Sequence, residues 1–226
     1  MTFDLSSWQA YFADFGQFFQ GFLFTLAISI SALILAMLLG IFFGTISTGK
    51  NKFLRGLARV YVEFYQNTPL LVQFVIVFYG FPIISNYILM PSIYWTAVLC
   101  VGLYHGAYIA EVIRSGIQSI SSGQTEAALS QGFTYTETMR YIILPQAFRI
   151  ILPPLINQIV NLIKNTSTVA IISGMDLIFV TKSWSALNAN YIPAFTGAAV
   201  LYFILCFPIA RWGRHVEENN KKAYSL

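Results

Sequence analysis

Long stretches without charge dominate this sequence and limit what the chain can fold into. Phe22–Phe43 holds 22 residues without a charged side chain. Crossing about 30 Å of hydrocarbon at about 1.5 Å per residue takes about 20 apolar residues. Apolar stretches follow at 60–80 and 150–173, which contain one charged residue each, Glu63 and Lys164, and at 93–110 and 192–210, which contain none. We therefore expect an all-α integral membrane protein of one domain, 1–226, with five transmembrane helices at about 18–45, 57–81, 91–115, 145–173 and 191–211.

The composition fits this class. The mean hydropathy is +0.66 and 10% of residues are charged, against about 25% in ordinary chains. The residues before the first stretch carry Asp4 and Asp14 without Lys or Arg, so a cleaved signal peptide is not expected. Cys100 and Cys206 both lie inside apolar stretches, so we expect them to act as small apolar residues and not to bind a metal.

The basic residues predict the orientation. They gather after the first, third and fifth stretches, at Lys50, Lys52, Arg55, Arg59, Arg114, Arg140, Arg149, Arg211, Arg214, Lys221 and Lys222. Basic loops stay in the cytoplasm, so the N-terminus is expected outside and the C-terminus inside a multi-pass cell membrane protein. The net charge of +4 follows from this topology, and without a basic stripe with interleaved aromatics no nucleic acid partner is expected.

Small residues on the first and third spans each predict a seam where another helix can pack closely. They recur every four residues, at Ala32, Ala36, Gly40 and Gly44 and again at Gly102, Gly106 and Ala110. Such rows allow two helix backbones to approach closely.

Polar stripes on three spans predict a solute path. A lysine near the middle of a span, as at Lys164, costs about 2.5 kcal/mol or more, so it should face water or a partner. Each stripe alone is consistent with interhelical hydrogen bonds of about 0.6 kcal/mol, and Glu111 has a possible partner in Arg114. Pro69 predicts a kink in the second span. The candidate substrate-path residues are Glu63, Asn67, Thr68, Gln73, Tyr104, Asn157, Gln158, Asn161 and Lys164.

Sequence motifs for catalysis or nucleotide binding fail. Residues 44–51 resemble a phosphate-binding loop, but Asn51 replaces the hydroxyl residue and a membrane helix precedes the loop. His105 and His215 are isolated from each other. We expect a transport subunit and not an enzyme, without a bound cofactor, whose energy comes from a partner or an ion gradient.

One polar segment, "EAALSQGFTYTETMRYIILP" at 126–145, stands apart in this apolar chain. Glu126 begins a short helical run and Gly132 permits a sharp bend. Thr134 or Thr136 can cap a second short helix, with Glu137 in the capping-box position after Thr134. The pattern predicts a helix–turn–helix on the cytoplasmic face; the alternative is an amphipathic surface linker.

This segment resembles the EAA loop of permease subunits of ABC importers. The pattern EAA-x3-G-x9-I-x-LP is matched at Glu126, Ala127, Ala128, Gly132, Ile142, Leu144 and Pro145. Residues 63–73, 107–117, 144–158 and 162–167 resemble the polar amino acid branch of that family. Many members of that branch have Arg-Gly where this chain has Gln66-Asn67.

The resemblance implies a type I importer for polar or charged amino acids. Cytoplasmic coupling helices at about 118–143 would bind a cytosolic ATPase dimer that holds ATP and Mg. A second permease, identical or homologous, and an extracytoplasmic amino acid binding protein would complete the assembly in the lipid membrane. The alternatives are a secondary transporter or channel driven by an ion gradient, and a membrane assembly factor.

Overall fold

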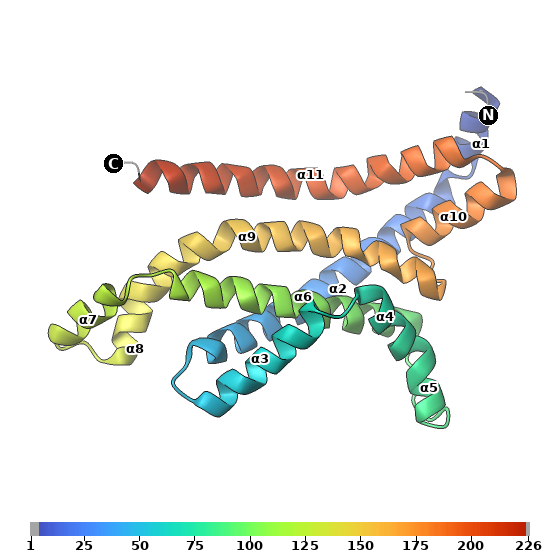
Figure 1. The fold of residues 1–226 in the computed structure, drawn as a ribbon. Helices are drawn as coiled ribbons and strands as arrows, with labels where there is room; N and C mark the ends of the chain where they lie inside the picture. Colours follow the sequence, from blue (N-terminus) through green and yellow to red (C-terminus); the bar gives the residue numbers. More distant parts are fainter. Residues whose placement is uncertain (1–4, 225–226) are drawn as a thin grey trace. The chain divides into compact units, whose positions relative to one another are not determined.

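The computed structural model describes residues 5–224, which form helices joined by turns (Figure 1). In chain order the elements are α1 (Leu5–Ala13), α2 (Phe15–Thr48), α3 (Lys52–Gln66), α4 (Leu70–Val75), the π-helical turn η1 (Ile76–Gly80), α5 (Phe81–Ile84), α6 (Ile93–Gln118), α7 (Ser122–Ser130), α8 (Tyr135–Thr138), the π-helical turn η2 (Met139–Ile143), α9 (Leu144–Asn165), the 3-10 helix η3 (Thr166–Ile172), α10 (Leu177–Asn188) and α11 (Tyr191–Tyr224).

Four helical stretches are long and apolar enough to cross a membrane: Phe15–Thr48, Ile93–Gln118, Tyr135–Ile172 and Tyr191–Asn220. A fifth span is present if α3 and the helices from Leu70 to Ile84 count as one broken span. The second span, expected at about 57–81 with a kink at Pro69, is a pair of helices separated by a break. Pro69 has no N–H and disfavours a helical Thr68, so one helix ends at Gln66 and the next begins at Leu70.

The chain divides into two compact units. The first comprises the described residues within Met1–Leu35, Thr68–Gly102 and Val160–Pro208. Its core is an aromatic and aliphatic cluster of Tyr11, Phe18, Leu177, Val180, Trp184, Ala194 and Ala198. The Trp184 ring nitrogen donates a hydrogen bond of 2.7 Å to Asp14, and the Leu177 amide donates one of 3.0 Å to the Thr25 hydroxyl. These bonds hold α10 against α2.

The second unit comprises the described residues within Ala36–Asn67, Leu103–Ile159 and Ile209–Leu226. The close helix approach predicted for the small residues is confirmed here as a seam between α2 and α6, a pairing that the sequence left open. Gly40 packs against Ile109, and Gly44 packs against Ala110 and Ile113. A side chain on either glycine would overlap these neighbours. Such close approach is expected where small residues face another helix.

The start of the fourth span differs from a simple helix beginning near residue 145. Pro145 is the second residue of α9, as expected for a proline in a first turn. However, α8, η2 and α9 follow one another without a break. Pro145 cannot donate to the carbonyl of Tyr141, and the wider π-helical turn at Met139–Ile143 accommodates the missing bond.

Candidate functional site

The polar segment forms two short helices with a bend between them. The first helix, α7, is capped by Ser121, whose hydroxyl accepts a hydrogen bond of 3.3 Å from the Gly123 amide. Glu126 and Ala127 are exposed on α7, whereas Ala128 is buried with 3% of its surface exposed. The helix therefore turns one side into the protein and leaves Glu126 and Ala127 open to solvent.

The bend depends on Gly132, whose φ is +91°. This region of backbone conformation is open to glycine and strained for other residues. Its position directly after α7 was predicted from the sequence and is confirmed. An added Cβ would meet no atom within 4 Å, so the glycine is needed for the backbone and not for space.

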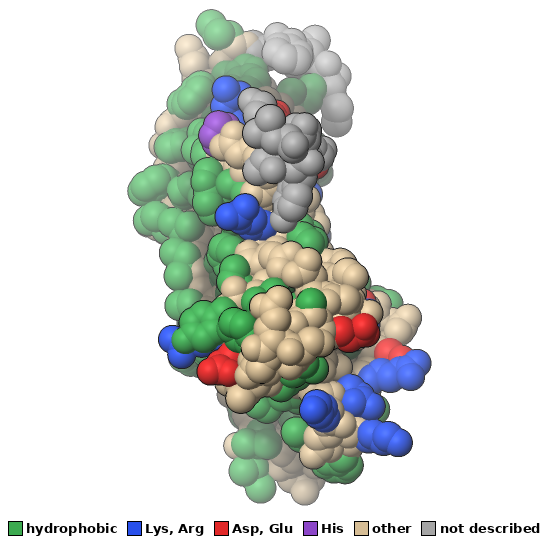
Figure 2. All heavy atoms as spheres, turned by 90° about the vertical axis from the view of Figure 1, so that its left-hand side faces the viewer, with side chains coloured by type: hydrophobic (Ala, Val, Ile, Leu, Met, Phe, Trp, Pro, Cys, Tyr) green, Lys and Arg blue, Asp and Glu red, His purple; other side chains and the backbone are tan. Residues whose placement is uncertain are grey.

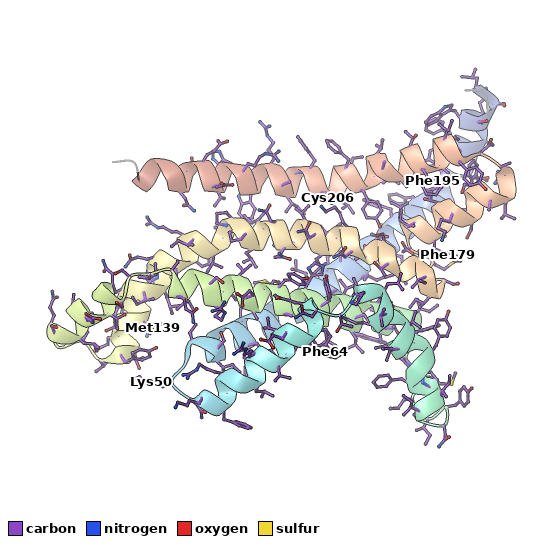
Figure 3. All side chains as sticks on the ribbon, in the orientation of Figure 1. Lys50, Phe64, Met139, Phe179, Phe195 and Cys206 are labelled. Atoms are coloured by element: carbon purple, nitrogen blue, oxygen red, sulfur yellow. The ribbon has the colours of Figure 1, made fainter. Side chains whose placement is uncertain are left out.

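The second helix, α8, begins with a complete capping box, which confirms Thr134 as the cap and excludes Thr136. The Glu137 amide donates to the Thr134 hydroxyl at 3.3 Å, and the Thr134 amide donates to the Glu137 carboxylate at 2.8 Å. The ammonium group of Lys50, which is labelled in Figure 3, lies 4.9 Å from the centre of the Tyr135 ring. The loop between α2 and α3 thus contacts α8.

The remaining motif residues lie at the join of η2 and α9. Met139 opens the π-helical turn (Figure 3). Ile142 is half-buried, whereas Leu144 and Pro145 are exposed. The seven motif residues thus lie on α7, in the Gly132 bend and at the join of η2 and α9. Glu126, Ala127, Gly132, Leu144 and Pro145 are at the surface.

The predicted stripe on the fourth span is open to the surroundings. Asn157, Asn161 and Lys164 are each exposed on α9. Their spacing places them along one side of that helix. Gln158 points elsewhere and makes a hydrogen bond with the buried His105.

The other candidate path residues mostly bond within their own segments. The Gln73 amide is buried and donates to the Thr68 carbonyl at 3.1 Å. The side-chain amide of Asn67 donates to the backbone carbonyl of Glu63 at 2.8 Å. On α6, the hydroxyl of Tyr104 lies 3.1 Å from that of Tyr108.

Glu63 lines a cavity that the sequence did not reveal. The cavity has a volume of about 640 Å³ and lies within the second unit, between α3, the end of α2 and α6. Glu63 pairs with Arg59 at 2.6 Å, and Glu111 pairs with Arg114, as its spacing suggested. The i, i+3 and i, i+4 spacings were visible in the sequence, but not that α3 and α6 enclose a common space.

The sequence resembling a phosphate-binding loop does not form one. Gly44 to Thr48 belong to the last turns of α2, and Gly44 packs against Ala110. Asn51 caps α3, because its side chain accepts from the amides of Phe53 at 2.9 Å and Leu54 at 3.3 Å. These groups are committed to helix structure and not arranged around a phosphate.

The long apolar helices are those of a multi-pass membrane protein, and the exposed part of the chain includes a capped helix–turn–helix. Residues 36–222 match the family described as the binding-protein-dependent transport system inner membrane component. The chain belongs to this family, which confirms the expected class of ABC importer permease in the cell membrane.

Similar proteins of known name support the same class. A probable glutamine ABC transporter permease protein, GlnM of Bacillus subtilis, is 36% identical over 94% of this chain and 97% of its own length. The glutamate/aspartate import permease protein GltJ of Escherichia coli (strain K12) is 36% identical over 84% of this chain and 81% of its own length.

Solved structures share the fold. A crystal structure of an amino acid ABC transporter with histidines matches with a TM-score of 0.86 at 28% identity, over 97% of this chain and all of that one. An inward-facing MetNI methionine ABC transporter matches with a TM-score of 0.62 at 13% identity, which shows a common fold alone.

Proposed function

We propose that this chain is the permease of an ATP-driven importer for polar or charged amino acids. The sequence relatives are named for glutamine and for glutamate and aspartate, and the structural relative at 28% identity is an amino acid transporter. The exposed stripe of Asn157, Asn161 and Lys164 on α9 supports a polar path for such a solute.

The observation that carries the coupling proposal is the α7–α8 turn. It exposes Glu126 and Ala127 beside a glycine bend and a capped second helix. We place it in the cytoplasm, with the N-terminus outside and the C-terminus inside, since the basic residues gather at that side. A cytosolic ATPase dimer would dock there, bind ATP and Mg, and move α8 and the continuous α9 on closing.

The chain itself would bind neither ATP nor Mg. This part of the proposal is supported by the helical and capping roles of residues 44–51. A second permease, identical or homologous, and an extracytoplasmic amino acid binding protein would complete the importer. The exposed stripe on α9 would then face the path formed with that second permease.

The test is uptake by proteoliposomes that contain the permease and its ATPase. With amino-acid-loaded binding protein outside and ATP inside, we expect uptake of labelled glutamine or glutamate and release of phosphate. The permease alone should release no phosphate. Uptake driven by a proton or sodium gradient without the ATPase would favour a secondary transporter, and lack of uptake for any polar amino acid would contradict the proposal.

A further inference from the structure

The cavity beside α3 holds an excess of positive charge. Four basic side chains line it, Lys52, Arg55, Arg59 and Arg114, with two acidic ones, Glu63 and Glu111. Each carboxylate is paired with an arginine, Glu63 with Arg59 and Glu111 with Arg114. In the described part of the chain Lys52 and Arg55 form no ion pair, so the cavity has two uncompensated cations. Figure 2 shows how Lys and Arg side chains, with acidic ones beside them, gather on one face of the protein.

The helix that forms one wall of this cavity is two-sided. Its exposed apolar side chains recur at helical spacing, with Phe53 78%, Leu57 49%, Val60 67% and Phe64 57% exposed. Lys52, Arg55 and Arg59 follow another side of α3 and line the cavity. Apolar residues on one side and basic residues on another are typical of a helix at the boundary between lipid and water.

Arg55, which lines the cavity, is held in place by backbone carbonyl groups. Arg55 donates from Nη1 to the carbonyls of Gly49 at 2.8 Å and Lys50 at 3.1 Å. These neutral partners fix the guanidinium and leave its charge uncompensated. A fixed guanidinium next to a lysine in the helix complements the geometry and the negative charge of a phosphate group.

We propose that this cavity binds the headgroup of an anionic phospholipid from the cytoplasmic leaflet. The phosphate would lie between Lys52 and Arg55, and the acyl chains would remain in the bilayer that the apolar side of α3 contacts. Basic pockets between membrane helices on the cytoplasmic side suit this ligand. A zwitterionic amino acid fits less well, because both carboxylates that would receive its ammonium group already pair with arginines.

This inference rests on the orientation in the proposed function, and not on the substrate or the ATPase. Phosphatidylglycerol serves as the probe lipid. The complex of permease and ATPase is placed in nanodiscs of phosphatidylglycerol and phosphatidylcholine, released into detergent, and weighed by native mass spectrometry. The readout is the phosphatidylglycerol that stays bound to each permease. Because this readout needs no transport, failure of uptake and failure of lipid binding are distinguishable.

The main variant is Lys52→Glu, which reverses one charge of the cavity. Lys52 is the first residue of α3, where an acidic side chain is compatible with the helix dipole, so the variant should fold. The matched control is Arg214→Glu, the same reversal at an exposed position of α11 outside the cavity. We expect Lys52→Glu to lower phosphatidylglycerol retention at least about fivefold for each unit of charge, and the control to retain it like the wild type.

Three outcomes would overturn the proposal. The first is equal phosphatidylglycerol retention by the wild type, Lys52→Glu and Arg214→Glu. The second is full displacement of the lipid by added inorganic phosphate, which would indicate a site for a free anion. The third is displacement by L-glutamine or L-glutamate, which would indicate an amino acid site on the cytoplasmic side.

Discussion

The α7–α8 turn and the α2–α6 seam are shaped by different kinds of interaction. The turn takes its form from neighbours in the sequence, through the Ser121 cap, the Gly132 bend and the capping box of Thr134 and Glu137. The seam takes its form from residues far apart in the sequence, such as Gly44 and Ala110. The turn is largely exposed and the seam is buried.

The difference separates folding from coupling. A surface that is shaped locally can meet another protein without contributing much to the stability of the chain. A buried seam contributes to stability directly, because its glycines leave no room for a side chain. Substitutions in the seam should therefore remove the folded protein, whereas substitutions in the turn should leave folded protein that does not transport.

The largest effect is expected for Gly44→Leu in the seam. A Cβ on Gly44 would lie 2.8 Å from the Cβ of Ile113 and 2.9 Å from the carbonyl oxygen of Ala110. The backbones must separate, at a cost of about 3 kcal/mol or more. We expect little protein in the membrane and a lowered melting temperature in detergent. Gly56→Ala on α3 is the control, since its Cβ would meet no atom within 4 Å. A Gly44→Leu variant with the membrane level and melting temperature of the wild type would contradict the stabilising role of the seam.

Next in size is Gly132→Pro in the turn. Proline requires a φ near −65°, whereas Gly132 has +91°, so the bend must change its course. Uptake should fall at least about tenfold, the effect of roughly 1.4 kcal/mol on a rate-limiting step. The level in the membrane should stay normal, as it should for Glu126→Lys, which reverses an exposed charge on α7. Gly123→Ala is the matched control on α7, and full uptake by Gly132→Pro at equal membrane level would refute the coupling role.

A buried helix cap allows a test through pH. Asp176 caps α10 by accepting from the Ile178 amide at 3.0 Å, and burial raises its pKa to about 6. A raised pKa means that the folded protein holds the proton more tightly. Stability is then fully present below the usual pKa near 3.8 and falls as pH rises toward about 6.

Asp176→Asn should remove this loss, because asparagine also caps a helix and has no charge to bury. We expect the variant to be more stable than wild type by about 2 kcal/mol at pH 8, and to match it at pH 4. Melting temperatures at both pH values give the measurement. If the melting temperatures of wild type and variant change with pH in parallel, a group other than Asp176 causes the pH dependence.

The smallest effect is expected for Thr134→Ala, at the exposed cap. Loss of the cap costs about 1 kcal/mol and is confined to the first turn of α8. Uptake should fall about two- to threefold, since the turn would adopt its docking shape less often. The melting temperature should not change. Thr134→Ser should restore uptake, and a large fall in melting temperature would show that the turn also supports the fold.

The features formed by near neighbours could be predicted from the sequence. The Gly132 bend and the kink at Pro69 follow from the backbone preference of one residue each. The capping pattern limited the cap of α8 to Thr134 or Thr136. Small residues at Gly40 and Gly44 repeat with the helical period, so a close helix approach was predictable, but not that α6 would be the partner. The pairing of Glu111 with Arg114 follows from their spacing on one helix.

The features formed by distant segments could not be predicted. The cavity beside α3 requires that Arg55 and Arg114 face a common space, which no local pattern specifies. The contact of Lys50 with Tyr135 likewise joins the loop between α2 and α3 to α8, which is distant in the sequence. The continuous helix through Pro145 depends on a π-helical turn, for which the sequence has no clear signal. The assigned roles of the substrate-path and coupling residues remain predictions.

The most direct test of the coupling account is photo-crosslinking from two exposed positions, one on α7 and one on α3. A photoreactive amino acid replaces Glu126 on α7 or Phe53 on α3, and the intact complex is irradiated in the membrane. We expect the residue at position 126 to capture the ATPase and the one at position 53 to capture lipid. Capture of the ATPase from position 53 with none from position 126 would contradict the docking role of the α7–α8 turn.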